Sequence, residues 1–92
     1  MHTYQIIIEY DGTNFVGWQK QKNGPSIQQT IEKILTKILK EKIILYGSGR
    51  TDAGVHAAGQ SAHFILKSKI NNKFLFLNSV NFFLYRKRIS IL

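Results

Sequence analysis

The spacing of apolar residues changes several times along this chain of 92 residues, and the order of the changes restricts the fold. Apolar and polar side chains alternate in "TYQIIIEY" at 3–10, which predicts a half-buried strand. Apolar residues then recur at helical spacing in 27–40, where Ser26 and Gln29 form a capping box that predicts the start of a helix. Alternation returns in "AAGQSAHFIL" at 57–66, which predicts another strand.

Three shorter segments complete the pattern. The sequence "KIILY" at 42–46 predicts a short strand, and "RISIL" at 88–92 predicts a last one. Between them, Asn71 or Asn72 would cap a second helix that runs to about Tyr85. The side chains expected to pack this helix against the sheet are Phe74, Leu77 and Phe82.

The resulting order, β-α-β-β-α-β, is that of a ferredoxin-like α+β domain. We therefore expect residues 1–92 to form one domain, with two helices on one face of an antiparallel sheet. The other face of the sheet would be left to meet solvent, a partner or a ligand.

The balance of charge is strongly basic. Thirteen Lys and Arg residues against five Asp and Glu residues give a formal net charge of +8, which favours a polyanionic partner such as nucleic acid. A lysine-rich surface without such a partner is the alternative. The chain has no cysteine, which excludes disulfides and thiolate metal sites, and its three histidines lack metal-ligand spacing. No apolar run approaches the length of a membrane span, so we expect a cytoplasmic protein.

The loop "GSGRTDAGVHA" at 47–57 is the candidate functional segment. Its glycines allow a close approach to a ligand, and Arg50 stands two residues from Asp52. The arginine would keep the carboxylate ionised or grip a phosphate, and such a carboxylate suits a nucleophile or a general base. The alternative is a turn with a surface salt bridge. Residue types alone leave both open.

Three stretches of the chain resemble the signature segments of the tRNA pseudouridine synthase A family. They are "YDGTNFVGWQKQ" at 10–21, "SIQQTIEKIL" at 26–35 and "GRTDAGVHA" at 49–57, the last followed by "GQ" at 59–60 and "HF" at 63–64. The likeness covers residues 4 to about 68.

The resemblance implies that Asp52 is the aspartate that lets uracil detach from its ribose and reattach through carbon, with neither metal nor cofactor. Whether the carboxylate attacks the sugar, attacks the base or removes a ribose proton stays open. Arg50 would order the site and help to push the target nucleotide out of its stack. The implied substrate is a uridine in the anticodon stem-loop of tRNA, and the implied assembly is a homodimer. Further RNA contacts are expected from Lys20, Lys22, Lys33 and Lys37.

Members of this family are longer, with a second ferredoxin-like half packed edge to edge against the first. By resemblance, residues 1–92 form the N-terminal half of the catalytic domain. The missing C-terminal half would carry the tyrosine that stacks on the uracil, and Tyr85 and Arg86 in "FFLYRKR" do not match its motif. We therefore expect the chain alone to be inactive and to associate through an exposed sheet edge. The competing hypothesis is a non-catalytic RNA-binding module of the same fold.

Overall fold

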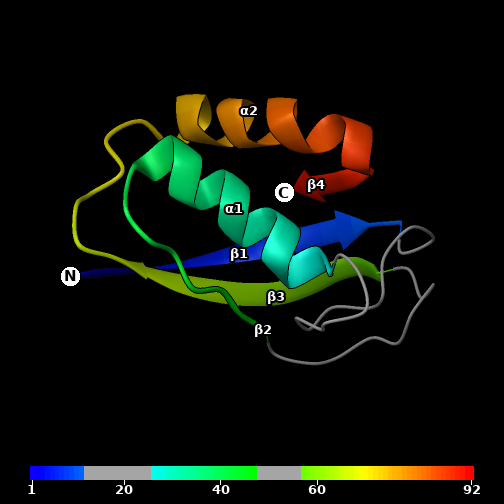
Figure 1. Cartoon of the computed structure of the whole chain (residues 1–92), viewed down its shortest axis with the longest axis horizontal. Helices are drawn as coiled ribbons and strands as arrows, with labels where there is room; N and C mark the ends of the chain where they lie inside the picture. Colours follow the sequence, from blue (N-terminus) through cyan, green and yellow to red (C-terminus); the bar gives the residue numbers. More distant parts are fainter. Residues whose placement is uncertain (12–25, 48–56) are drawn as a thin grey trace.

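The computed structural model of the protein describes residues 1–11, 26–47 and 57–92. Within these residues, four strands form one sheet, accompanied by two α-helices and a short 3₁₀ helix (Figure 1). In chain order the elements are β1 (His2–Tyr10), α1 (Ile27–Leu39), β2 (Tyr46–Gly47), β3 (Ala57–Leu66), α2 (Lys73–Leu84), η1 (Tyr85–Lys87) and β4 (Ile89–Ile91). This order confirms the predicted ferredoxin-like α+β class.

The sheet has the strand order β2-β3-β1-β4, and every neighbouring pair is antiparallel. Its longest ladder joins β1 to β3, from the pair His2 and Leu66 to the pair Tyr10 and Ala57, with one register shift near the latter end. Helices α1 and α2 lie next to each other over the same face of the sheet (Figure 1). The predicted layer arrangement is therefore confirmed.

Alternation along the strands decides which side chains meet the helices. On β1, Ile6 and Ile8 are buried, whereas Ile7 between them lies on the open face. Phe64 of β3 is fully buried, and its ring stacks on that of Tyr4 with 5.6 Å between the ring centroids. The residues that α1 buries against these strands are Ile27, Ile31 and Leu35.

Both helices begin at residues that the sequence identifies as caps. The Oγ of Ser26 accepts a hydrogen bond from the N–H of Gln29 at 3.1 Å. The Oδ1 of Asn72 accepts one from the N–H of Leu75 at 3.0 Å, which selects Asn72 over Asn71. No helix in the described part of the chain is long and apolar enough to cross a membrane.

Helix α2 packs through a different face from the predicted one. Val80 and Leu84 are buried and Leu77 is half-buried, but Phe74 and Phe82 are 72% and 71% exposed. The prediction is therefore right for Leu77 and wrong for both phenylalanines. Apolar residues occur all round this helix, so their spacing cannot select the buried face. The result is an apolar outer surface on α2.

Two of the predicted strands are shorter in the structure. The strand expected at 42–46 is reduced to Tyr46–Gly47, because the backbone just before it bonds to side chains of α1, as described below. The strand expected at 88–92 is reduced to Ile89–Ile91. Here Arg88 adopts the left-handed conformation at the end of η1, with φ of 58°, so the extended chain begins one residue later.

The edges of the sheet are β2 and β4, and both are short. The side chain of Asn81 on α2 covers part of the β4 edge. Its Nδ2 donates to the C=O of Ile91 at 2.9 Å, and its Oδ1 accepts from the N–H of Ile91 at 2.8 Å. These short strands cover only part of their neighbours, because β4 pairs with residues 8–10 of β1 and β2 pairs with Ala62 and His63 of β3. Within the described residues, the rest of β1 and β3 has no neighbouring strand on that side. Association through a sheet edge, which stays a prediction, therefore has unpaired strand available.

Candidate functional site

The structure describes two of the six residues that the sequence assigns to the site. Lys33 and Lys37 are exposed one turn apart on α1. The Nζ of Lys37 lies 4.9 Å from the centroid of the Phe83 ring on α2, a cation–π contact between the two helices. The other four lie outside the described residues, and their roles stay predictions: Asp52, Arg50, Lys20 and Lys22.

The fold determines where the chain leaves and re-enters the sheet around Asp52. The segment that carries this residue follows Gly47 at the end of β2 and precedes Ala57 at the start of β3. Gly47 pairs with Ala62, and Ala57 pairs with Tyr10 at the end of β1. The candidate segment is thus attached at both ends to one sheet, and its later attachment lies at the C-terminal end of β1.

An open groove of about 650 Å³ lies at this same end of β1. Asp11 and Arg88 lie in its wall and form an ion pair, with 3.2 Å between the Oδ2 of Asp11 and the Nη1 of Arg88. The N–H of Asp11 also donates to the C=O of Arg88 at 3.0 Å. Tyr85, which is 81% exposed, and Arg86 line the groove as well. The groove therefore combines an aromatic ring with guanidinium groups, a combination suited to nucleotides.

Three polar side chains of α1 hold the backbone that leads into β2. The Oγ1 of Thr36 accepts from the N–H of Ile43 at 3.0 Å. The Oε2 of Glu32 accepts from the N–H of Leu45 at 2.8 Å, and the Nε2 of Gln28 donates to the C=O of Leu45 at 2.7 Å. We call Gln28, Glu32 and Thr36 the α1 polar ladder. The ladder bonds backbone groups of residues 43–45 that a neighbouring strand would otherwise pair. It thereby holds the backbone that precedes the segment with the candidate carboxylate.

Glu32 is the member of the ladder that sequence reasoning should have found. It is only 5% exposed, between the buried residues Ile31 and Leu35. Burying a carboxylate is costly unless it is paired, so an acidic residue on the apolar face of a helix signals a specific partner. The helical spacing of apolar residues in 27–40 does not predict this role of Glu32.

Replacing Glu32 with Ala should lower the free energy of unfolding by about 1–3 kcal/mol, because it leaves the buried N–H of Leu45 without this acceptor. Urea denaturation measures the change. Lys33→Ala on the same helix, at an exposed position, is the control and should change stability by less than about 0.5 kcal/mol. Equal losses in the two variants would contradict the assigned role.

The face of the sheet away from the helices offers few aromatic rings. Tyr46 of β2 stacks on His63 of β3, with 5.2 Å between ring centroids and an interplanar angle of 20°. Elsewhere, the central strands present residues such as Gln5, whose Nε2 donates to the Oγ of Ser61 at 2.7 Å, and Ile65. RNA-recognition modules stack bases on aromatic side chains of the central strands. The described part of this face lacks that pattern.

Residues 1–11, 26–47 and 57–92 contain no group of three His, Asp or Glu side chains that could hold a metal ion. The polar chemistry of the described site consists of the groove, the α1 polar ladder and the exposed lysines of α1.

A family model and the curated relatives that match this chain indicate the same family. A family model described as tRNA pseudouridine synthase matches residues 6–75. The chain is 59% identical over 92 residues to the tRNA pseudouridine synthase A of Pelagibacter ubique, an alignment that covers the whole chain and 37% of that relative. It is 48% identical over 89 residues to the protein of the same name from Ehrlichia ruminantium, covering 96% of the chain and 36% of the relative.

A further similar protein is the tRNA pseudouridine synthase A 1 of Protochlamydia amoebophila. It is 58% identical over 72 residues, which cover 77% of the chain and 28% of that relative. The chain thus spans little more than a third of the length of the curated relatives that match nearly all of it.

Proposed function

Because this chain belongs to the tRNA pseudouridine synthase family, we propose that residues 1–92 form the N-terminal half of a pseudouridine synthase catalytic domain. The match over residues 6–75 carries the proposal, because it includes the whole segment with Arg50 and Asp52. The reaction is the isomerisation of uridine to pseudouridine in the anticodon stem-loop of tRNA.

The chemistry needs a carboxylate but no redox partner or activated donor. The bond between the uracil nitrogen and the sugar breaks, the base turns, and a ring carbon bonds to the same sugar carbon. That ring carbon loses its proton and the freed nitrogen takes one up, so the product is an isomer of uridine. Asp52 would serve as a nucleophile towards the sugar or the base, or as a base towards a ribose proton. Arg50 would position the extruded nucleotide beside it.

The RNA itself would be held chiefly through its phosphates. Lys33 and Lys37 are exposed one turn apart on α1, which supports their assignment as phosphate contacts. The remaining contacts are assigned to Arg50, Lys20 and Lys22.

We further propose that the enzyme acts in the cytoplasm as a homodimer. The exposed apolar surface of α2 supports an interface, because large apolar patches on soluble proteins mark interaction sites. The side chains that form this surface are Phe74, Leu75, Phe82 and Phe83. Light scattering that finds only monomers of the whole enzyme would contradict the dimer.

A chimera tests the proposed activity. Residues 1–92 replace the aligned part of the Pelagibacter relative, with which they share 59% identity, and unmodified tRNA transcript is the substrate. Mass spectrometry of the digested RNA should show pseudouridine in the anticodon arm with the chimera and with the relative. The chain alone should yield none, because more than half of each relative lies outside the aligned part.

A folded chimera that binds tRNA without converting uridine would contradict the proposal. That result would favour the non-catalytic RNA-binding module. Turnover by the chain alone, at the rate of the relative, would contradict the assignment of a half-site.

A further inference from the structure

We propose that five exposed lysines at the end of the domain remote from the groove form a second RNA contact, which binds the phosphate backbone of tRNA beyond the anticodon hairpin. This inference deepens the proposed function and rests on it. We call the surface the basic pole, and its members are Lys40, Lys42, Lys67, Lys69 and Lys73.

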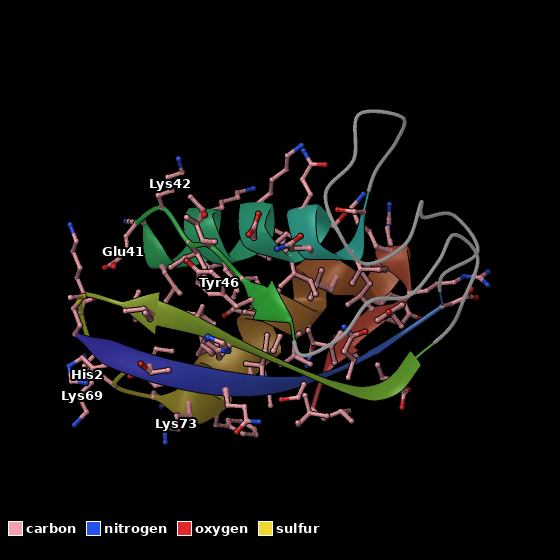
Figure 2. The ribbon with its side chains drawn as sticks, turned by 90° about the horizontal axis from the view of Figure 1, so that it is seen from below. His2, Glu41, Lys42, Tyr46, Lys69 and Lys73 are labelled. Atoms are coloured by element: carbon pink, nitrogen blue, oxygen red, sulfur yellow. The ribbon has the colours of Figure 1, made fainter. Side chains whose placement is uncertain are left out.

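The fold gathers these lysines from three separate places in the sequence. Two follow the end of α1, two lie in the turn after β3, and one is the first residue of α2. Glu41 joins the first group to the second, because its Oε1 accepts from the N–H of Lys67 at 2.7 Å. Its Oε2 accepts from the Oγ of Ser68 at 3.0 Å. Figure 2 shows Lys42 and Glu41 at the same end of the molecule as Lys69 and Lys73.

The charge at this end is nearly all positive. Glu41 is the one acidic residue within the stretches 39–47 and 66–73 that form it. The N–H of Lys67 holds the pKa of the Glu41 carboxyl below its ordinary value, so that carboxylate is ionised at neutral pH and offsets a single lysine. The first turn of α2 has Lys73 and no acidic residue, although a helix N-terminus favours an anion. The placement of Lys73 therefore does not serve helix stability.

Five solvent-exposed ammonium groups with so little opposing charge fit a polyanion. Lysine is a flexible point charge that contacts phosphates without reading base sequence, and each phosphate contact releases counterions. The proposed substrate, tRNA, is such a polyanion, because its backbone carries regularly spaced phosphates.

The distance of the basic pole from the groove determines which part of the RNA it can contact. Strand β1 runs from His2, which Figure 2 shows at the same end of the molecule as Lys69 and Lys73, to Tyr10 in the wall of the groove. Eight residue steps of a strand correspond to roughly 27 Å, and the longest extent of the molecule is 35 Å. An RNA whose target uridine lies near the groove must therefore extend along most of the domain to reach these lysines. A whole tRNA extends further than its isolated hairpin.

Two charge-matched double variants test the inference in the chain of residues 1–92. Lys69→Gln with Lys73→Gln removes two charges from the basic pole, and Lys33→Gln with Lys37→Gln removes two from α1. Binding of unmodified tRNA and of the isolated anticodon stem-loop is measured by fluorescence anisotropy over a range of salt concentrations. Circular dichroism checks that each variant is folded.

The pole variant should bind tRNA about tenfold more weakly, with a salt slope smaller by about 2. Its affinity for the isolated hairpin should change less than about twofold. The α1 variant should weaken both RNAs. Equal effects of the two variants on both RNAs, or no effect of the pole variant on tRNA, would overturn the inference. Loss of binding to vesicles containing phosphatidylserine, with tRNA affinity retained, would overturn it in favour of a lipid surface.

The binding test of the pole variant and the activity test of the chimera together separate this inference from the proposed function. If tRNA binding depends on the basic pole but the chimera forms no pseudouridine, the RNA contact stands and the assigned reaction fails. If the chimera is active and the pole variant binds tRNA normally, the reaction stands and the second contact fails.

Discussion

Asp52→Asn in the chimera should lower the rate of pseudouridine formation by roughly 10²- to 10⁴-fold, which is the range for loss of an acid–base group. The substitution keeps the shape of the side chain and removes its negative charge and basicity. Affinity for tRNA should change less than about twofold, because phosphate contacts dominate RNA binding. The rate is measured by mass spectrometry of tRNA in single-turnover reactions with excess enzyme.

The control removes the same charge from a carboxylate outside the candidate segment 47–57. Glu41→Gln also converts a carboxylate to an amide, but its partners are the backbone and hydroxyl of the turn after β3. At saturating tRNA its rate should stay within a few-fold of that of the unsubstituted chimera. If Asp52→Asn were equally active, the catalytic assignment of Asp52 would be wrong.

Phe64→Ala should lower the free energy of unfolding by about 3–5 kcal/mol, the cost of truncating a buried phenylalanine. Phe64 is fully buried near the C-terminal end of β3 and stacks on Tyr4, so no solvent can refill the space that its ring leaves. A domain of this length has a total stability of roughly 5–14 kcal/mol. The variant should therefore be close to unfolding at room temperature, as measured by urea denaturation.

The same substitution on α2 is the matched comparison. Phe74 is 72% exposed, so Phe74→Ala should change stability by less than about 0.5 kcal/mol. This pair of variants also tests which face of α2 packs against the sheet. A loss at Phe74 as large as that at Phe64 would restore the packing that the sequence pattern predicted.

Residue spacing predicts an element well where one face of it is apolar and the other is polar. Strand β1 and helix α1 satisfy this condition, and their buried residues, such as Ile8 and Ile31, match the prediction. Helix α2 does not, since apolar residues surround it and Phe74 and Phe82 remain exposed. Its orientation is determined by tertiary contacts, including the bonds of Asn81 to β4, which spacing along the sequence cannot reveal.

The residues of the candidate site also divide into those that the sequence reveals and those that it does not. Asp52 and Arg50 stand out because a whole segment of sequence resembles a known signature. The groove residues Asp11 and Arg88 are 77 positions apart, so nothing local in the sequence links them. The α1 polar ladder could have been suspected from Glu32, but its partners are backbone groups, which every residue carries. Sequence reasoning identifies unusual side chains more readily than it finds what they bind.

The α1 polar ladder also bears on the order in which the protein folds. Its bonds join residues 7, 13 and 17 positions apart, whereas side-chain bonds between β1 and β3 join residues 50 and 56 positions apart. Closing a short loop costs less entropy, and contacts that are local in sequence form earlier. During refolding, pulsed hydrogen exchange should protect the N–H of Leu45 before the N–H groups of β1, and the reverse order would refute this sequence of events. Strand β1, which precedes the other described elements along the chain, would then be among the last to pair into the sheet.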